Sequence, residues 1–291
     1  MMEMKNALIQ RAKELHISQI GFAPAEFDPK LMEILKKRGK IPFENRPPEE
    51  RANPLSALAD AKTIVVYLCS YYTGKSGNLS RYAMGRDYHA VLGEMGLSLC
   101  ELLWERGFQA KAYTDNGPLN DRYLAYSAGL GFFGKNGFLI HPKWGSYTFI
   151  GYVITDCFIE PDVPVQGECM GCGRCIAACP GKALGENFSY DSEKCASYIS
   201  QKKGELSAHE QAILRASGSV WGCDLCQSVC PHNEHAALTE IPAFSEALTE
   251  VLCPEKEMSN REFQRKYKDK AFAWRGKGVV MRNLEILKKE E

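Results

Sequence analysis

The chain has 291 residues, and its 36 basic residues balance its 36 acidic residues, so the whole molecule gives no electrostatic reason to bind nucleic acid or a membrane surface. A hydrophobic fraction of 45% at this length allows one large core with a smaller domain beside it. The sequence shows no signal peptide and no apolar run of ~18 residues, which argues against a secreted or membrane-spanning protein.

The first half of the chain shows alternating helical and strand patterns. Apolar residues recur at helical spacing over residues 4–16, and a polar, proline-rich stretch follows at 42–54. Residues 63–69 form a short apolar run rich in β-branched residues, which is typical of a buried strand. A long amphipathic helix is expected over 87–106, ended by Gly107.

The alternation continues to about residue 160. Residues 109–114 predict a returning strand, 118–128 a helix and 146–155 a second strong strand. Between them, the segment 129–137 contains four glycines, which allow backbone amides to approach a ligand closely. Strands that alternate with helices predict a layered α/β or α+β domain over roughly residues 1–160.

Eight of the twelve cysteines follow a pattern that fits two iron–sulfur clusters. One run reads C-x2-C-x2-C-x3-C-P and the other C-x2-C-x3-C-P. In the bacterial pattern the last cysteine of a run binds the neighbouring cluster. A symmetric ferredoxin would place the missing ligand at Val220, so the cysteine between the runs is the expected substitute. The two predicted sets are Cys169, Cys172, Cys175 and Cys230, and Cys179, Cys195, Cys223 and Cys226.

Two other uses of these cysteines are less consistent with the sequence. A disulfide framework is typical of small secreted domains. Zinc sites usually pair two C-x2-C knuckles without a third cysteine and a following proline. The pattern therefore favours two [4Fe–4S] clusters, and together with free thiols it indicates a reducing cytoplasm. Cys69 and Cys100 are predicted core residues, whereas Cys157 and Cys253 have no predicted role.

These patterns predict three regions. An α+β domain occupies residues 1–165, a two-cluster module occupies 166–235 with its longest helix at 207–216, and a C-terminal extension occupies 236–291. From Arg261 onward the extension holds ten Lys/Arg and five Asp/Glu residues. That local excess of positive charge could bind phosphate groups, and it could equally be an ordinary solvent-exposed surface.

Several motifs resemble the epoxyqueuosine reductase family, in order over about residues 45–285. The resemblance implies a nitroreductase-like α+β domain that holds base-off cobalamin, with a bacterial ferredoxin-like two-cluster [4Fe–4S] module against it. The family is related in architecture to reductive dehalogenases. Besides the cysteine runs and Cys195, the motifs are RYAMGRDYH at 81–89, TDNGP at 114–118, GLGFFGKN at 129–136, GSY at 145–147, WGCDLC at 221–226 and AWRG at 273–276.

The resemblance implies the conversion of epoxyqueuosine to queuosine at the wobble position of certain tRNAs. Clusters would relay single electrons, cobalamin would carry the hard chemistry, and a protein acid would protonate the departing epoxide oxygen. The family's proton-donor position matches Asp115, which by spacing alone would be a turn or helix-capping residue. As an acid, Asp115 would need a raised pKa, through burial against the corrin or a nearby carboxylate.

The resemblance also implies a set of cobalamin contacts. Some of these residues could instead have ordinary structural roles: Leu139 and Ile150 would be core residues in any fold, and Arg81 could be a surface charge. Outside this set, His89 could be a helix residue whose ring nitrogens are hydrogen-bonded within the fold. Cys223 would be a cluster ligand first. The implied contacts are Arg51, Arg81, Tyr82, Asp115, Lys135, Leu139, Ile150, Ser197, Lys203, Cys223 and Asp224.

Many family members continue into helical repeats that help to grip tRNA, whereas only eight residues follow Asn283 here. The chain is therefore expected to be a short form of the family. Its expected partners are tRNA and an external low-potential electron donor such as a ferredoxin or flavodoxin, with no membrane. Two alternatives stay open: a corrinoid reductase for a different small substrate, and a ferredoxin-like electron carrier that is not itself catalytic.

Overall fold

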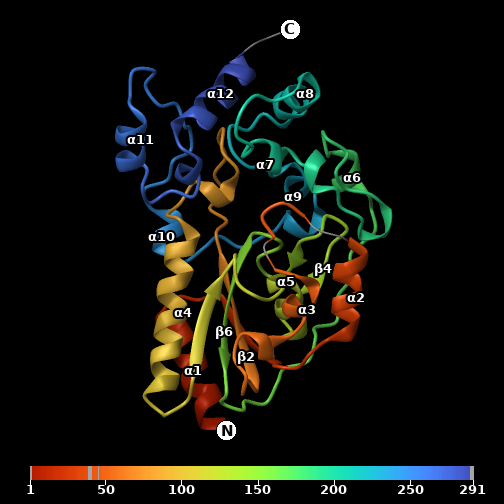
Figure 1. Cartoon of the computed structure of the whole chain (residues 1–291), viewed down its shortest axis with the longest axis vertical. Helices are drawn as coiled ribbons and strands as arrows, with labels where there is room; N and C mark the ends of the chain where they lie inside the picture. The colour runs from red at the N-terminus through yellow and green to blue at the C-terminus, as the bar shows by residue number, and fades with distance from the viewer. Residues whose placement is uncertain (1, 39–40, 45, 289–291) are drawn as a thin grey trace.

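The structure of the protein is a computed structural model that describes residues 2–38, 41–44 and 46–288. Its large domain is built on a four-stranded antiparallel sheet with the strand order β1-β2-β6-β3 (Figure 1). The strands are β1 (Gln19–Pro24), β2 (Thr63–Ser70), β3 (Ala110–Thr114) and β6 (Thr148–Thr155).

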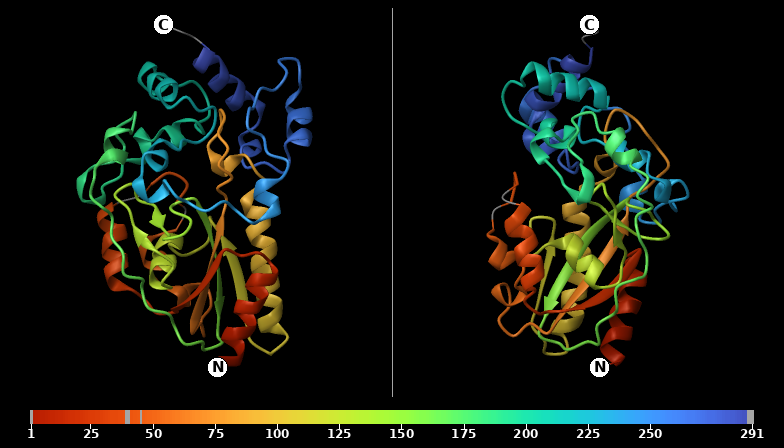
Figure 2. Two further views of the ribbon diagram at one scale, coloured as in Figure 1. Left: turned by 180° about the vertical axis from the view of Figure 1, so that it is seen from behind. Right: turned by 90° about the vertical axis from the view of Figure 1, so that its right-hand side faces the viewer.

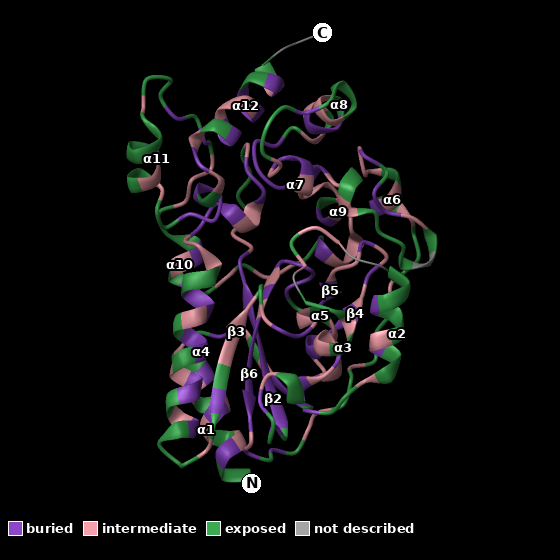
Figure 3. Cartoon of the chain, viewed as in Figure 1, coloured by how far each residue is buried: buried purple, intermediate pink, exposed green. Residues whose placement is uncertain are grey.

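Strand β2 is buried along its whole length, because both faces of the sheet are covered (Figure 3). Side chains alternate across a strand, so Val65, Tyr67 and Cys69 belong to one hydrophobic core and Ile64, Val66 and Leu68 to the other. This two-sided burial explains why the sequence of β2 is a continuous apolar run rather than an alternating one.

Different helices cover the two faces of the sheet (Figure 2). Helices α1 (Met2–Glu14) and α4 (Tyr88–Trp104) pack over the core that contains Tyr67. Helix α5 (Asp121–Ser127) packs over the opposite core, and α2 (Pro29–Arg38) and α3 (Pro48–Arg51) lie beside it. The mixed α and β architecture agrees with the expected fold class.

The long predicted elements of this domain are confirmed, with small shifts at their ends. Helix α4 begins after Asp87, whose carboxylate accepts a hydrogen bond from the backbone N–H of His89 at 3.0 Å. Cys69 and Cys100 are buried in the core, as expected. Strand β1 and helix α2 were not predicted. The glycine and proline of QIGFAP weaken the strand pattern of β1.

The cluster module consists mostly of loops and very short helices. Its cysteine loop turns through Gly171 and Gly173, whose φ angles of 66° and 69° favour glycine. The longest helix, α8, is confirmed close to its predicted bounds and carries a capping box of Ser207 and Glu210. The helices are α6 (Arg174–Ala177), α7 (Ala196–Ile199), α8 (Ala208–Ser217) and α9 (Leu225–Ser228).

The C-terminal extension packs against both other regions. One hydrophobic core combines Met84 of the large domain, Trp221 of the cluster module and Phe272 of the extension. The fully buried Asn283 donates hydrogen bonds of 2.8 Å to the carbonyl oxygens of Ser200 and Val220. The helices of the extension are α10 (Pro242–Ser245), α11 (Asn260–Lys266) and α12 (Lys277–Lys288).

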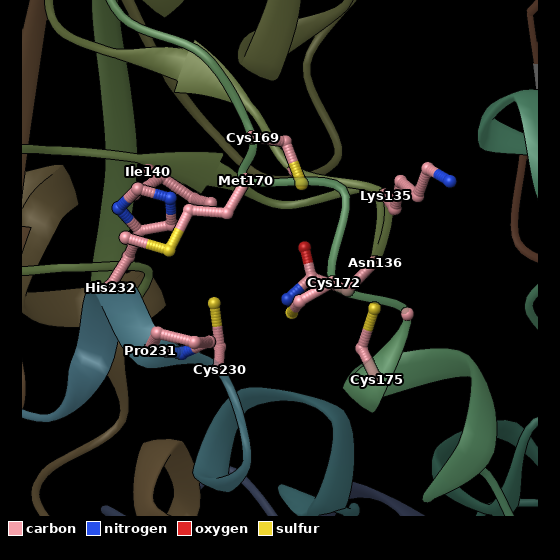
Figure 4. A pocket seen from close by; sticks show the side chains of 12 residues that line it. Lys135, Asn136, Ile140, Cys169, Met170, Cys172, Cys175, Cys230, Pro231 and His232 are labelled. Carbon is pink, nitrogen blue, oxygen red and sulfur yellow. The ribbon is translucent and has the colours of Figure 1, made fainter.

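A second, two-stranded sheet pairs β4 (Phe132–Phe133) with β5 (Leu139–Ile140), and their connection carries Lys135 and Asn136. This small hairpin lies beside the cysteine loop of the cluster module (Figure 4). Within the part of the chain that the structure describes, no helix is both long enough and apolar enough to cross a bilayer.

Candidate functional site

Four cysteines from two separate loops line one pocket. They are the four that the crossover pattern assigned to one cluster, and their sulfur atoms surround a common space (Figure 4). Cys172 is exposed and Cys175 is buried, so the pocket lies near the surface on one side only. The four residues are Cys169, Cys172, Cys175 and Cys230.

The other four cysteines form a second, more buried set. Burial raises the pKa of the Cys226 thiol, and the charges of Cys223, Cys195 and Cys179 raise it further, so all four sulfurs lie close together. Burial, followed by the charges of Cys195, Asp224 and Cys179, raises the pKa of Cys223 to about 11. Cys195, the substitute for the ligand missing at Val220, therefore lies with the second set.

Two buried side-chain nitrogen atoms line the first pocket without a partner among the described residues. The side chain of Asn136 is 5% exposed, and its Nδ2 makes no hydrogen bond. The Nε2 of His232 is likewise buried and unpaired. Buried polar groups are normally hydrogen-bonded, so these atoms fit an acceptor within the pocket, and the sulfur atoms of an iron–sulfur cluster are such acceptors. Among the described residues, no group of three or more His, Cys, Asp and Glu side chains is arranged for a single metal ion.

Asp115 lies at the end of β3, in a small cluster of polar side chains. Tyr88 donates a hydrogen bond of 2.7 Å from its hydroxyl to Oδ2 of Asp115, and His89 Nε2 lies 3.2 Å from the same oxygen. The other ring nitrogen of His89 lies 2.8 Å from Oδ1 of Asp87. The end of β3 and the first turn of α4 thus form a carboxylate–imidazole–carboxylate chain. Asp115 has a φ of +55°, which is uncommon for a residue other than glycine.

The electrostatics of this cluster differ from the expectation that Asp115 has a raised pKa. Burial alone would raise the pKa of Asp115, but hydrogen bonds from His89 and Tyr88 and the charge of His89 outweigh it, so the pKa is lowered. Burial would lower the pKa of His89, but its bonds to Asp115 and Asp87 raise it to about 9. The expectation is therefore wrong for this structure: Asp115 is ionised at neutral pH and His89 carries the proton.

A second carboxyl group beside Asp115 has the opposite shift. Burial, and next the negative charge of Asp115, raise the pKa of Asp121 to about 8. Neighbouring titratable groups with pKa values pushed apart are typical of acid–base sites. The sequence analysis missed Asp121, because an aspartate in the first turn of a helix is usually explained by the helix dipole.

The RYAMGRDYH motif also contacts the cluster module. Asp224 accepts hydrogen bonds from the backbone N–H of Arg81 at 2.7 Å, from Nη1 of Arg81 at 3.2 Å and from the Ser80 hydroxyl. Trp221 donates its indole N–H to the Tyr82 hydroxyl at 2.9 Å. Three implied cobalamin contacts, Arg81, Tyr82 and Asp224, thus lie together at the junction of the two regions.

Electrostatic contacts connect this junction to Asp115. Burial, followed by the charges of Asp224 and Asp115, raises the pKa of Tyr82, and the Tyr82 ring lies 6.3 Å from that of Tyr88, which donates to Asp115. Contacts through Tyr88, Tyr82 and Trp221 therefore lead from Asp115 to the loop that carries Cys223.

The remaining implied contacts are more dispersed. Arg51 forms an ion pair with Glu44, and its charge also acts on Asp121. Lys135 pairs with Glu186 at 2.5 Å and lines the first cysteine pocket, rather than the Asp115 cluster.

Leu139 is buried, and Ile150 packs against the same core, so their side chains serve the fold. Ser197 is partly buried and accepts hydrogen bonds through its carbonyl oxygen, and Lys203 is exposed. The structure leaves the role of all four residues toward a cofactor as a prediction.

A sheet domain with an acid–imidazole cluster, joined to a module with two sets of four cysteines, defines the class of iron–sulfur oxidoreductases. Two family models match parts of the chain. Residues 168–233 match the "4Fe-4S double cluster binding domain". Residues 51–116, which contain the RYAMGRDYH motif and Asp115, match "Epoxyqueuosine reductase QueG, DUF1730".

Whole-chain comparisons agree with these models. The chain is 33% identical to the epoxyqueuosine reductase of Bacillus cereus, over 97% of this chain and 79% of that protein. The chain therefore belongs to the epoxyqueuosine reductase family. It is 31% identical to a solved epoxyqueuosine reductase bound to an epoxyqueuosine-modified tRNA-Tyr stem loop, with a TM-score of 0.90 over 98% of this chain and 80% of that chain.

Two further solved structures are informative. The Bacillus subtilis epoxyqueuosine reductase, with its catalytic aspartate loop swung out of the active site, is 31% identical with a TM-score of 0.85, over 98% of this chain and 81% of that chain. A reductive dehalogenase whose structure suggests a mechanism for B12-dependent dehalogenation is 15% identical, with a TM-score of 0.52 over 97% of this chain and 35% of that chain. At that identity the likeness concerns the fold alone.

Proposed function

We propose that this protein reduces epoxyqueuosine to queuosine in tRNA. The observation that carries the proposal is a chain of contacts from the acid cluster to a cysteine loop: Tyr88, which donates to Asp115, has its ring 6.3 Å from that of Tyr82, and the Tyr82 hydroxyl accepts a hydrogen bond from Trp221, two residues before Cys223. An acid site and an electron source thus lie together in a chain of the epoxyqueuosine reductase family. A relative in that family has been solved with the modified tRNA stem loop.

The eight motif cysteines hold two [4Fe–4S] clusters in this proposal. Cys169, Cys172, Cys175 and Cys230 bind the outer cluster, and Cys179, Cys195, Cys223 and Cys226 bind the inner one. The exposure of Cys172 makes the outer cluster the entry point for electrons from an external low-potential donor such as a ferredoxin or flavodoxin. The domains of this proposal are 1–165 for the cofactor and acid site, 166–235 for the clusters and 236–291 for the C-terminal extension.

We further propose that base-off cobalamin binds where a nitroreductase-like sheet domain meets the cluster module. One buried donor there is unused: Nε of Arg81 has no hydrogen-bond partner in the described part of the chain. A corrinoid carries peripheral amides whose oxygens could accept that bond, so the donor fits the group. The residues that would hold it are Arg51, Arg81, Tyr82, Asp115, Lys135, Leu139, Ile150, Ser197, Lys203, Cys223 and Asp224. When bound, cobalamin supplies a metal centre that accepts electrons one at a time.

The polar cluster supplies protons in the proposed reaction. Removal of the epoxide oxygen as water consumes two electrons and two protons, and an alkoxide is a poor leaving group without protonation. Asp115 is the residue through which a proton held by His89 passes to the departing oxygen. Because His89 is protonated at neutral pH and contacts Oδ2 of Asp115, it resupplies that proton. In a relative the catalytic aspartate lies on a loop that can swing out, and Asp115 lies in the connection between β3 and α5.

The decisive test uses protein reconstituted anaerobically with iron, sulfide and cobalamin. It is mixed with an epoxyqueuosine-containing anticodon stem loop and a low-potential reductant, and the RNA is analysed by mass spectrometry. We expect the loss of one oxygen atom from the modified nucleoside. Cobalamin binding without this product, when the Bacillus cereus relative gives it in parallel, would mean that the substrate is a different small molecule. Clusters without cobalamin binding would indicate an electron carrier.

A further inference from the structure

Three aromatic side chains from separate regions of the chain meet at one place on the surface. Phe43 lies in the connection between α2 and α3, Tyr198 in α7, and Trp274 in the 3₁₀ helix η6 (Ala273–Arg275). The ring centroid of Phe43 lies 5.4 Å from that of Tyr198 and 6.0 Å from that of Trp274, both edge to face. We call these three residues the aromatic trio.

The trio is exposed to an extent unusual for contacting aromatic residues. Phe43 is 47% exposed and Trp274 is 56% exposed, although each ring packs against another. Phe43 also has a φ of +69°, which is unfavourable for a bulky side chain. Edge-to-face packing of the rings leaves flat ring surface open, so the trio has faces available for stacking.

Positive side chains lie between and over the rings. The guanidinium carbon of Arg275 is 3.7 Å from the ring centroid of Trp274 and 5.4 Å from that of Phe43. The Lys202 ammonium is 5.8 Å from the ring centroid of Tyr198. Among the described residues, the buried Nε of Arg275 has no hydrogen-bond partner. Aromatic rings interleaved with cations are characteristic of surfaces that bind single-stranded nucleic acid.

Ion contacts link the trio to the proposed acid site. Glu44, which follows Phe43, pairs with Arg51. The charge of Arg51 in turn acts on Asp121, whose pKa responds to the charge of Asp115. Phe43 is therefore one residue from an ion pair whose arginine acts electrostatically on the proposed acid site.

We propose that the aromatic trio with Arg275 is a stacking platform for an unpaired RNA base that flanks the modified nucleoside in the anticodon loop. This inference rests on the proposed function. Anticodon-loop bases are unpaired and offer π faces to the rings, and the backbone phosphates next to them meet Arg275. The platform gives a net-neutral chain a local means of holding RNA at the reaction site.

The test compares Phe43→Ala and Trp274→Ala with the matched control Phe158→Ala, whose ring is 45% exposed and lies outside the trio. The dissociation constant for the epoxyqueuosine-containing stem loop is measured by fluorescence anisotropy at fixed salt, on protein with intact clusters. Cobalamin affinity is measured separately by absorption. We expect each trio variant to raise the RNA dissociation constant by about tenfold or more, with Phe158→Ala unchanged. Trp274→Phe, which keeps a ring, should restore most of the affinity.

Several outcomes would overturn the platform: unchanged RNA affinity in both trio variants, no RNA binding by the unaltered protein, or a loss of cobalamin affinity in place of RNA affinity. The last result would assign the trio to the corrinoid site. These results are distinct from failure of the proposed function. If the unaltered protein binds the stem loop through the trio but does not remove the epoxide oxygen, the reaction is wrong and the platform stands.

Discussion

The sheet domain and the cluster module are stabilised in different ways. All eight residues of β2 are buried between two hydrophobic cores. In the module, α6, α7 and α9 have four residues each, and the local core has six buried residues, one of them supplied by α12. Helices of one turn are not stable alone, so the module depends on what its cysteines bind. The sheet domain is therefore stabilised mainly by its buried apolar side chains, whereas the cluster module is expected to depend on the metal clusters that its cysteines bind.

The largest expected effect is that of losing one cysteine ligand, which should destabilise the cluster module and leave the sheet domain folded. Cys226→Ala should remove about four iron atoms per chain and make the segment 166–235 sensitive to protease, while the sheet domain remains resistant. Iron analysis and mass spectrometry of limited digests measure both effects. The control is Cys253→Ala, because Cys253 is exposed and has no assigned role. Full iron content in Cys226→Ala would disprove the ligand assignment.

The next effect tests the sheet domain as the site of acid chemistry. Asp115→Asn should lower the single-turnover rate by about 10²–10⁴-fold, because an amide cannot deliver a proton. Iron content and the cluster absorption spectrum should stay unchanged. Asp60→Asn is the matched control, since Asp60 is an exposed aspartate outside the site. Normal turnover by Asp115→Asn would exclude it as the proton donor.

Two leucines that are buried to the same extent, one in each region, test whether the regions differ in how they are stabilised. Leu99 of the sheet domain and Leu214 of α8 are both fully buried. Leu99→Ala should lower the free energy of unfolding of the sheet domain by about 2–5 kcal/mol, whereas Leu214→Ala should shift only the transition in which iron is released. Urea unfolding followed by circular dichroism and by cluster absorption separates the two. If both variants shifted one common transition equally, the two regions would be a single cooperative unit.

The pH dependence of His89 is a smaller effect within the sheet domain. Its pKa is raised from the ordinary value of 6.5 to about 9 in the folded protein. The stability it contributes is therefore complete below pH 6.5 and is lost as the pH rises through 9. Because the side chain is 43% exposed, we expect less than about 1 kcal/mol.

An NMR titration of the His89 ring and unfolding measurements on either side of this range test the prediction. His89→Gln should abolish that part of the pH dependence, and the reaction rate of the unaltered protein should fall above pH 9. A ring that titrates near pH 6.5 would contradict the proposed contacts with Asp115 and Asp87.

The smallest predicted effect concerns the pocket of the outer cluster. If the unpaired Nδ2 of Asn136 donates to a cluster sulfur, it stabilises the reduced, more negative state. Asn136→Ala should then lower the midpoint potential of that cluster by roughly 40 mV, which corresponds to a hydrogen bond of about 1 kcal/mol. A spectroelectrochemical titration measures the shift. Asn116→Ala serves as the control because Asn116 is exposed, and an equal potential in both variants would contradict the bond.

Local patterns were sufficient to predict much of the fold. The runs at 63–69 and 87–106 are long and apolar, so period and length identified β2 and α4. Strand β1 has an interrupted pattern, and its pairing with β2 is a tertiary contact that composition does not show. The cysteine sets were predictable because iron–sulfur ligation imposes a fixed spacing.

The acid cluster could be predicted only in part. Asp115 was found through a motif, but its pKa depends on His89 and Tyr88, which are 26 or 27 positions away in sequence and meet it only after β3 pairs with β6. Sequence spacing carries no information about such contacts, so the direction of the pKa shift of Asp115 was expected wrongly.

The two hydrogen bonds from Asn283 have a consequence for assembly. They bind the backbone at Ser200 and Val220, next to the loops that carry Cys195 and Cys223. Because a ribosome produces the chain from its N-terminus, those loops emerge well before the residue that fixes them. The two loops can therefore reach their final positions only after α12 has been synthesised and has packed against the cluster module.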